Sequence, residues 1–172
     1  MNPLRWHRHL NFAMQHLLQL KKHLLNLLDA EGAHIRFEEA VKSFPPKLRG
    51  KKPEGAPHTA WQLLEHLRIA QSDILEFSRD AQHVSPKWPE GYWPESVAPP
   101  NDKAWQKSVA QFRDDLEQMK NLLKKVREEE LYKRIPHGDG QTLLREVLIL
   151  ADHNSYHLGQ LMHLRKTLES KQ

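Results

Sequence analysis

The chain has 172 residues, 38% of them hydrophobic, and this length and composition predict one domain with a substantial core over residues 1–172. It contains no cysteine, which excludes disulfides, thiolate metal ligands and a cysteine nucleophile. The formal net charge of +4 is scattered among acidic residues, so we expect no nucleic-acid partner. The densest basic run, 47–52, adjoins two prolines, and we interpret it as a solvated loop.

Helical periodicity begins near the N-terminus. Leucines and an alanine recur in steps of three and four through Pro3–Asp29, which is typical of an amphipathic helix. This segment has neither a signal-peptide pattern nor an apolar run of membrane length, so we expect a soluble, cytoplasmic protein without a membrane partner. A short amphipathic piece, Ile35–Phe44, follows. A second long helix is predicted over Thr59–Arg79, where Thr59 and Gln62 have the spacing of a capping box.

The second half of the chain predicts a long connector and two more helices. The connector, 85–100, contains too many prolines for a continuous helix. The next helix starts at the N-cap Asn101 and has the most regular apolar stripe of the chain: Trp105, Val109, Phe112, Leu116, Met119, Leu123 and Val126. A last helix is predicted over Gln141–Leu168. Four amphipathic helices of comparable length bury their stripes on one another, so we expect an all-α four-helix bundle.

Three histidines on two of these helices carry the functional signal. Twelve histidines in 172 residues give roughly one pair four residues apart by chance, so spacing alone decides nothing. On an ideal helix, however, His153 and His157 fall within the inward stripe of the last helix, and His66 within that of the second. Apolar residues frame both positions: Leu63, Ile69, Ala70 and Phe77 around His66, and Leu143, Leu150, Leu161 and Leu164 along the row of His157. His163 is turned away from this row, and we expect it at the surface.

Inward histidines on two helices need a polar partner, because burying an unpaired polar group costs free energy. A shared divalent metal ion would supply one, and three neutral imidazoles would leave it an open coordination position, as in catalytic sites. Zinc and nickel are the leading candidates for such a nitrogen site, and ligand type does not decide between them. The alternative is that His66, His153 and His157 are satisfied core residues and bind no metal.

Two segments around the histidines carry a family resemblance. Trp61–Leu67, with its Trp-Gln-Leu-Leu-Glu-His-Leu sequence, and His153–Gln160, with its His-x-x-x-His-Leu-Gly-Gln pattern, resemble motifs of the DinB/YfiT-like family. The connector 88–94 and the turn 136–142 extend the likeness over nearly the whole chain. The resemblance implies an up-down-down-up four-helix bundle, a divalent metal held by the three histidines, and often a homodimer. Some relatives are transferases that add a low-molecular-weight thiol to an electrophile, and many others have no assigned activity.

Further polar residues are weaker candidates. Asp73 lies seven residues after His66 on the same helical row, so it is a candidate acid–base group or hydrogen-bond partner of a ligand, with a surface salt bridge or a capping role as the alternative. Asn154 and Tyr156 flank the ligands, and we expect surface or interhelical hydrogen bonds from them rather than catalysis. Three more residues, His58, His137 and Asp139, are explained by capping and turn chemistry.

Two other features have competing explanations. The aromatic residues of the connector, Trp88, Tyr92 and Trp93, either cover the mouth of a pocket or hold the long loop on the helices. Gly159 is unfavourable in a helix by about 1 kcal/mol relative to alanine. Close approach of another helix, within the bundle or across a dimer, would explain that glycine; the alternative is that the helix simply tolerates it.

The leading functional hypothesis is a metal-dependent transferase or hydrolase in which a thiol or water attacks a small electrophile. Its catalytic part comes from the family resemblance, because function belongs to sites rather than to folds. The alternative is a non-catalytic metal-binding module, either stress-linked or serving interactions, on the same bundle. A nucleic-acid-binding protein would instead need its basic residues on one surface.

Overall fold

The structure is a computed structural model that describes residues 3–31 and 34–171, with the side chains of 3–14 and of residue 128 left aside. The described residues form six α-helices, two short 3-10 turns (Pro46–Leu48 and Glu90–Tyr92) and no strand. The helices are α1 (Pro3–Leu28), α2 (Phe37–Val41), α3 (Ala60–Arg79), α4 (Asp102–Lys125), α5 (Glu128–Tyr132) and α6 (Leu143–Glu169). None of the described helices combines the length and apolarity needed to cross a bilayer. The all-α prediction is therefore confirmed.

Side-chain caps fix where the three central helices begin. Thr59 Oγ1 accepts from the backbone N–H of Gln62 (3.2 Å), while Gln62 Oε1 accepts from the backbone N–H of Thr59 (3.1 Å), so the expected capping box is confirmed. Asn101 Oδ1 accepts from the N–H of Ala104 at 2.9 Å, as expected of an N-cap. Thr142 caps α6 in the same way, which places the start of that helix two residues after the expected one.

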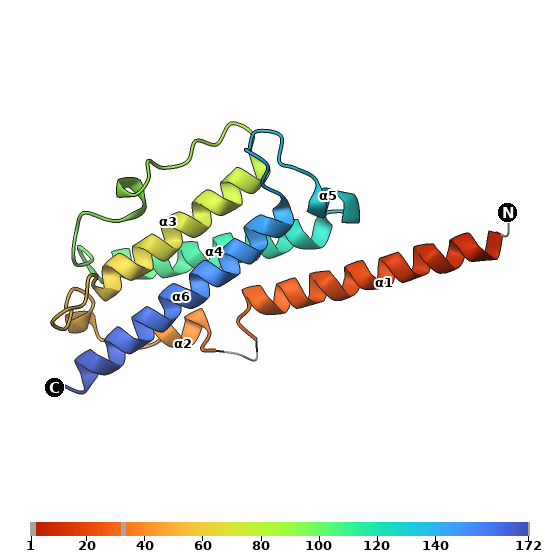
Figure 1. Ribbon diagram of the computed structural model, residues 1–172. Coiled ribbons are helices and arrows are strands. Elements are labelled where there is room, and N and C mark those ends of the chain that lie inside the picture. The colour runs from red at the N-terminus through yellow and green to blue at the C-terminus, as the bar shows by residue number, and fades with distance from the viewer. Residues whose placement is uncertain (1–2, 32–33, 172) are drawn as a thin grey trace.

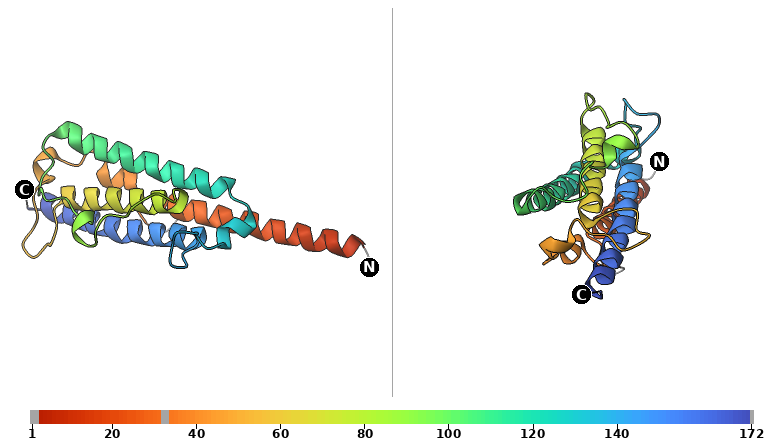
Figure 2. Two further views of the ribbon diagram at one scale, coloured as in Figure 1. Left: turned by 90° about the horizontal axis from the view of Figure 1, so that it is seen from above. Right: turned by 90° about the vertical axis from the view of Figure 1, so that its left-hand side faces the viewer.

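Helix α3 packs on both α4 and α6, and these three helices carry most of the core (Figures 1 and 2). Their apolar stripes meet in two clusters of buried side chains. The cluster beside α2 includes Phe37, Leu64, Leu67, Trp105, Phe112 and Leu161. The cluster beside α1 and α5 includes Leu24, Leu28, Leu75, Met119, Leu123 and Leu150. These clusters hold α3 and α6 side by side, which is the arrangement that the candidate site requires.

Helix α1 packs less completely than expected. Its C-terminal part contacts α4 and α6 and contributes Leu24 and Leu28 to the second cluster. Its N-terminal half extends past the ends of the other helices, as Figures 1 and 2 show. The expectation of four helices of comparable length covering one another thus holds for α3, α4 and α6, while α1 contributes only part of its length to the packing.

Two segments differ from the sequence-based interpretation. The charged stretch after α4 was not predicted to be helical, but it forms the short helix α5. Leu131 of this helix is fully buried and anchors it to the second cluster. In the basic run 47–52, Arg49 is 5% exposed, pairs with Asp102 and lies over the ring of Trp105 at 4.5 Å. The interpretation of the whole run as a solvated loop was therefore wrong for Arg49.

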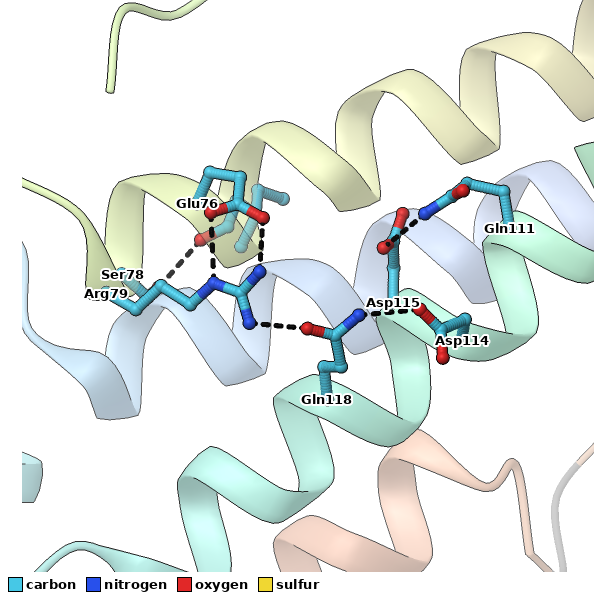
Figure 3. A network of polar contacts seen from close by, with 8 residues as sticks. Glu76, Ser78, Arg79, Gln111, Asp114, Asp115 and Gln118 are labelled. Carbon is cyan, nitrogen blue, oxygen red and sulfur yellow. Dashed lines mark hydrogen bonds and ion pairs between the residues drawn. The ribbon is translucent and has the colours of Figure 1, made fainter. Parts of the chain in front are cut away.

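A polar network joins the C-terminal end of α3 to α4 (Figure 3). Arg79 donates to Gln118 Oε1, and Gln118 Nε2 donates to Asp114 Oδ2 at 2.7 Å. Gln111 donates to one carboxylate oxygen of the buried Asp115, whose other oxygen has no partner among the described residues. Burial raises the pKa of Asp115. The exposed contacts of Arg79 and Gln118 contribute little free energy, so the apolar clusters carry the stability of the α3–α4 pair.

The packing of α6 on α3 gives a stability prediction. Replacing the fully buried Leu161 with alanine should lower the free energy of unfolding by roughly 2–5 kcal/mol, because the lost side chain leaves a cavity in the first cluster. The same change at Leu148, which is 44% exposed on the same helix, should cost less than about 1 kcal/mol. Urea unfolding followed by circular dichroism measures both, and equal costs would contradict the packing described here.

Candidate metal centre

Three imidazole rings meet between α3 and α6. His66 comes from α3, and His153 and His157 lie one turn apart on α6. One ring nitrogen from each lies within 4.8 Å of the others, and the Nε2 atoms of His66 and His153 are 3.0 Å apart. His66 and His157 are buried, with 3% and 7% of their surface exposed, and His153 is half-buried. The structure thus brings together the three residues that the sequence singled out.

Two of the rings are oriented by hydrogen bonds from their Nδ1 atoms. Nδ1 of His66 lies 2.9 Å from the backbone carbonyl of Tyr92, and Nδ1 of His157 lies 2.8 Å from Gln160 Oε1. Because both partners are acceptors, we assign the ring proton of each histidine to Nδ1. The lone pair of Nε2 then points into the space between the three rings, as in metal sites where an outer acceptor fixes the ligand tautomer.

The surroundings of the rings keep them uncharged. Burial, followed by the charges of His157 and His66, lowers the pKa of His153 to about 4. Burial also lowers the pKa of His157 to about 4, although its hydrogen bond to Gln160 acts in the opposite direction. The pKa of His66 is lowered by burial as well, against the effect of the Tyr92 carbonyl. Neutral imidazole is the form that binds metals, so the three rings are in the required state at neutral pH.

This donor set fits a divalent metal ion. Three neutral imidazoles present nitrogen donors at one point, and the described part of the chain brings no carboxylate into the same cluster. Without an ion, the Nε2 lone pair of His66 faces the Nε2 of His153 at 3.0 Å, and the buried Nδ1 of His153 has no partner in the described residues. Shared coordination of the Nε2 atoms would account for their close approach.

An aromatic wall closes one side of the cluster. The indole of Trp93 stacks on the ring of His66 with 3.8 Å between ring centroids and an interplanar angle of 3°. The opposite face of Trp93 stacks on His58, again at 3.8 Å. His58 therefore belongs to the rim of the site, although its position before α3 suggested only capping or turn chemistry. The sequence held no signal for this role, because the contact depends on how the 85–100 connector folds back.

Asp73 does not touch the three histidines but is connected to them through the connector. Its Oδ2 accepts from the hydroxyl of Tyr92 at 2.6 Å, and its Oδ1 lies 2.7 Å from Nε2 of His83. Burial and the bond to Asp73 raise the pKa of Tyr92 to about 12, so the tyrosine stays protonated as the donor. Because the carbonyl of the same tyrosine faces His66, Asp73 holds the segment that orients a candidate ligand.

The remaining candidates lie outside the cluster. His163 is exposed, as expected, and Asn154 makes an interhelical hydrogen bond to Gln71. His137 contacts the backbone carbonyl of Phe77 at the far end of α3. Tyr156 is 64% exposed, with its ring edge-on to His157.

Gly159 and the aromatic residues of the connector have different outcomes. A Cβ atom added at Gly159 would meet nothing within 4 Å, so the explanation by close approach of a helix within the chain was wrong. Tyr92 and Trp93 both reach the site, by a carbonyl oxygen and by a stacked ring. Trp88 is 70% exposed and contacts only the edge of Tyr92 among the described rings.

A groove with a volume of about 480 Å³ opens beside the histidine cluster. Its wall consists of the loop before α3, the first turn of α3 and the C-terminal half of α6, and includes Pro57, His58, Leu63, Gln160, Leu164 and Thr167. Two of these residues link the groove to candidate ligands. Gln160 is hydrogen-bonded to His157, and His58 stacks on Trp93, whose other face stacks on His66. The volume is within the range of small-molecule sites.

Comparison with known families agrees with this geometry. A family model described as the DinB superfamily matches residues 30–161. The chain belongs to the DinB superfamily. The matched region contains α2 to α5 and most of α6, and with them all three histidines, whereas α1 precedes it. No curated protein matches the chain.

The lowered pKa of His157 predicts a pH dependence for this DinB-superfamily chain without metal. Between pH 6.5 and about 4, the unfolded chain takes up a proton at this position and the folded chain does not, so stability falls on acidification. One such group contributes at most about 1.4 kcal/mol per pH unit. Replacing His157 with glutamine should therefore reduce the slope of unfolding free energy against pH in this window.

Urea unfolding at pH 6.5, 5.5 and 4.5 in the presence of a chelator measures that slope. Replacement of the exposed His163 with glutamine on the same helix is the matched control, because its side chain lies outside the cluster. Identical slopes for the parent and the His157→Gln variant would contradict burial of a neutral imidazole at this position.

Proposed function

We propose that this protein binds a divalent metal ion, zinc or nickel, through His66, His153 and His157, and is a metal-dependent transferase or hydrolase. The observation that carries the proposal is the convergence of three neutral imidazoles, two of them fixed by Nδ1 hydrogen bonds so that Nε2 is free. The ion would act as a Lewis acid and lower the pKa of a thiol or water, which would make that group nucleophilic at neutral pH.

The protein residues prepare and enclose this centre. The Tyr92 carbonyl and the Gln160 amide hold two rings in one tautomer, so that little reorganisation is needed on binding. Trp93 covers one face of His66 and shields that side of the cluster from water. Asp73 keeps the connector in place through Tyr92, and we assign it this positioning role rather than that of an acid or base.

The groove beside the cluster supports a small molecule as the reaction partner. Oε1 of Gln160 accepts a hydrogen bond from His157, and the amide nitrogen of Gln160 has no hydrogen-bond partner among the described residues. That N–H₂ group can therefore donate to an oxygen of a substrate lying in the groove. The apolar walls from Pro57, Leu63 and Leu164 suit the carbon skeleton of an electrophile. A low-molecular-weight thiol is the second substrate that we propose.

The topology of the helices and the oligomeric state are part of the same proposal. We place α1, α3, α4 and α6 as the four helices of an up-down-down-up bundle in a single cytoplasmic domain, with the DinB match over residues 30–161 as support. A homodimer is supported by exposed apolar side chains on the outer face of α6, where Ile149 is 40% and Tyr156 64% exposed. Gly159, with open space around it, lies on the same helix and would allow a second copy to approach closely.

Metal content is the decisive measurement for the proposed site. Protein prepared without a histidine tag should contain close to one equivalent of metal by elemental mass spectrometry, and the His66→Ala and His157→Ala variants should lose most of it, because each removes one nitrogen donor. His163→Ala is the control and should retain the metal. A parent protein that takes up no zinc or nickel, even after reconstitution, would refute the proposal.

The role of the groove can be tested separately, once a screen of thiols and electrophiles has found a reactive pair. Thr167 lines the groove and is not one of the candidate metal ligands. Thr167→Trp should therefore fill the groove and lower kcat/KM at least roughly tenfold, a rise of about 1.4 kcal/mol in activation free energy, while leaving metal content unchanged. Lys166→Trp adds the same bulk on an exposed neighbour and should retain activity. Full activity of the Thr167 variant would place the substrate elsewhere. Absence of any activity in a metal-loaded parent would favour the non-catalytic metal-binding module, in which Trp93 seals the site.

A further inference from the structure

Two buried polar atoms on consecutive residues of α6 have no hydrogen-bond partner in the part of the chain that the structure describes. They are Nδ1 of His153 and Oδ1 of Asn154, and neither exposes its surface to solvent. Such atoms are costly to bury alone. The first is the outer nitrogen of the third candidate ligand, the equivalent of the atoms that Tyr92 and Gln160 hold in the other two rings.

The Asn154 amide is held in one orientation from its other end. Its Nδ2 donates to Gln71 Oε1 at 3.0 Å, and Gln71 Nε2 in turn donates to the backbone carbonyl of Phe112 at 2.5 Å. Gln71 is fully buried and Asn154 is 7% exposed, so water does not compete for these bonds. Because a carbonyl oxygen only accepts and an amide nitrogen only donates, this chain from α4 through α3 determines which end of Asn154 is the oxygen.

The side chain of Asn154 neighbours that of His153 on α6. A hydrogen-bonding contact from the Asn154 side chain opposes the fall in the pKa of His153, which burial and the neighbouring histidines cause. Neither Nδ1 of His153 nor Oδ1 of Asn154 has a hydrogen-bond partner in the described part of the chain. Two buried atoms without a partner thus belong to consecutive residues of α6, and a proton on Nδ1 of His153 would make them a donor and an acceptor.

We propose that Asn154 is the outer hydrogen-bond partner of His153, accepting from its Nδ1–H when Nε2 binds the metal, and that Gln71 is the residue that orients it. This inference rests on the proposed metal site. It gives each of the three ligands an oxygen acceptor at Nδ1: a backbone carbonyl for His66, the Gln160 amide for His157 and the Asn154 amide for His153. Asn154 and Gln71 are thus positioning residues, which connect the metal centre to the backbone of α4.

The test is the affinity of the full chain for cobalt(II), followed by the absorption of the bound ion. Asn154→Leu removes the acceptor and should weaken binding about 10–100-fold, the usual effect of losing an outer partner of a ligand. Asn154→Asp retains an acceptor oxygen but loses the donor to Gln71, so it should bind cobalt more tightly than the Leu variant. Ser155→Ala is the matched control, because the side chain of Ser155 bonds to Ala151 and His34 and to no candidate ligand among the described residues.

A purely structural role for Asn154 would lower the melting temperature of the metal-free Leu variant without changing its cobalt spectrum. Parent-like cobalt affinity and an unchanged spectrum in that variant would overturn the inference while leaving the metal site intact. If the parent itself binds no cobalt, the proposed function fails with it. Should the Leu variant not fold, nitrogen-15 NMR of the zinc-loaded parent decides: Nδ1 of His153 is expected to carry a proton protected from exchange, and a proton on Nε2 would refute the proposal.

Discussion

The burial of three neutral imidazoles between α3 and α6 is the constraint on which the rest of the structure depends. A histidine ring carries one donor and one acceptor, and both need partners once water is excluded. Here the acceptors converge on one point, and the donor nitrogens of His66 and His157 reach outward to oxygen atoms. Leucine-rich clusters on either side, among them Leu64 and Leu150, keep the two helices close enough for the rings to meet.

The long connector between α3 and α4 explains how a loop contributes to this centre without supplying a ligand. Its backbone carbonyl at Tyr92 and its indole at Trp93 both contact His66, one at the ring edge and one at the ring face. The loop needs an anchor of its own, because segments of this length gain little from internal hydrogen bonds. Asp73 on α3 is that anchor, through Tyr92 and His83. The Asp73 carboxylate, with 12% of its side chain exposed, thus acts on the site through the connector without contacting the histidines.

The sequence predicted those features that depend on local chemistry and periodicity. Caps at Thr59 and Asn101, the inward direction of the three histidines and the burial of the stripe from Trp105 to Leu123 follow from short-range rules. Other features depend on contacts between distant segments. The Tyr92 carbonyl belongs to the backbone, and no residue type encodes its role. His58 reaches the rim because the connector folds back, and the amphipathic pattern of α1 is the same whether its N-terminal half is covered or not.

The position of Trp93 has a consequence for how this protein can be observed. Its indole lies face to face with a candidate ligand on one side and with a groove residue on the other, both at 3.8 Å. Electronic states of an indole respond to charge placed against the ring face, where the negative part of the quadrupole lies. Among the tryptophans whose side chains the structure describes, Trp93 is the one stacked on His66, so a charge at the histidine cluster would act on this indole at shorter range than on the others. The fold has thereby placed a natural chromophore between the histidine cluster and the adjacent groove.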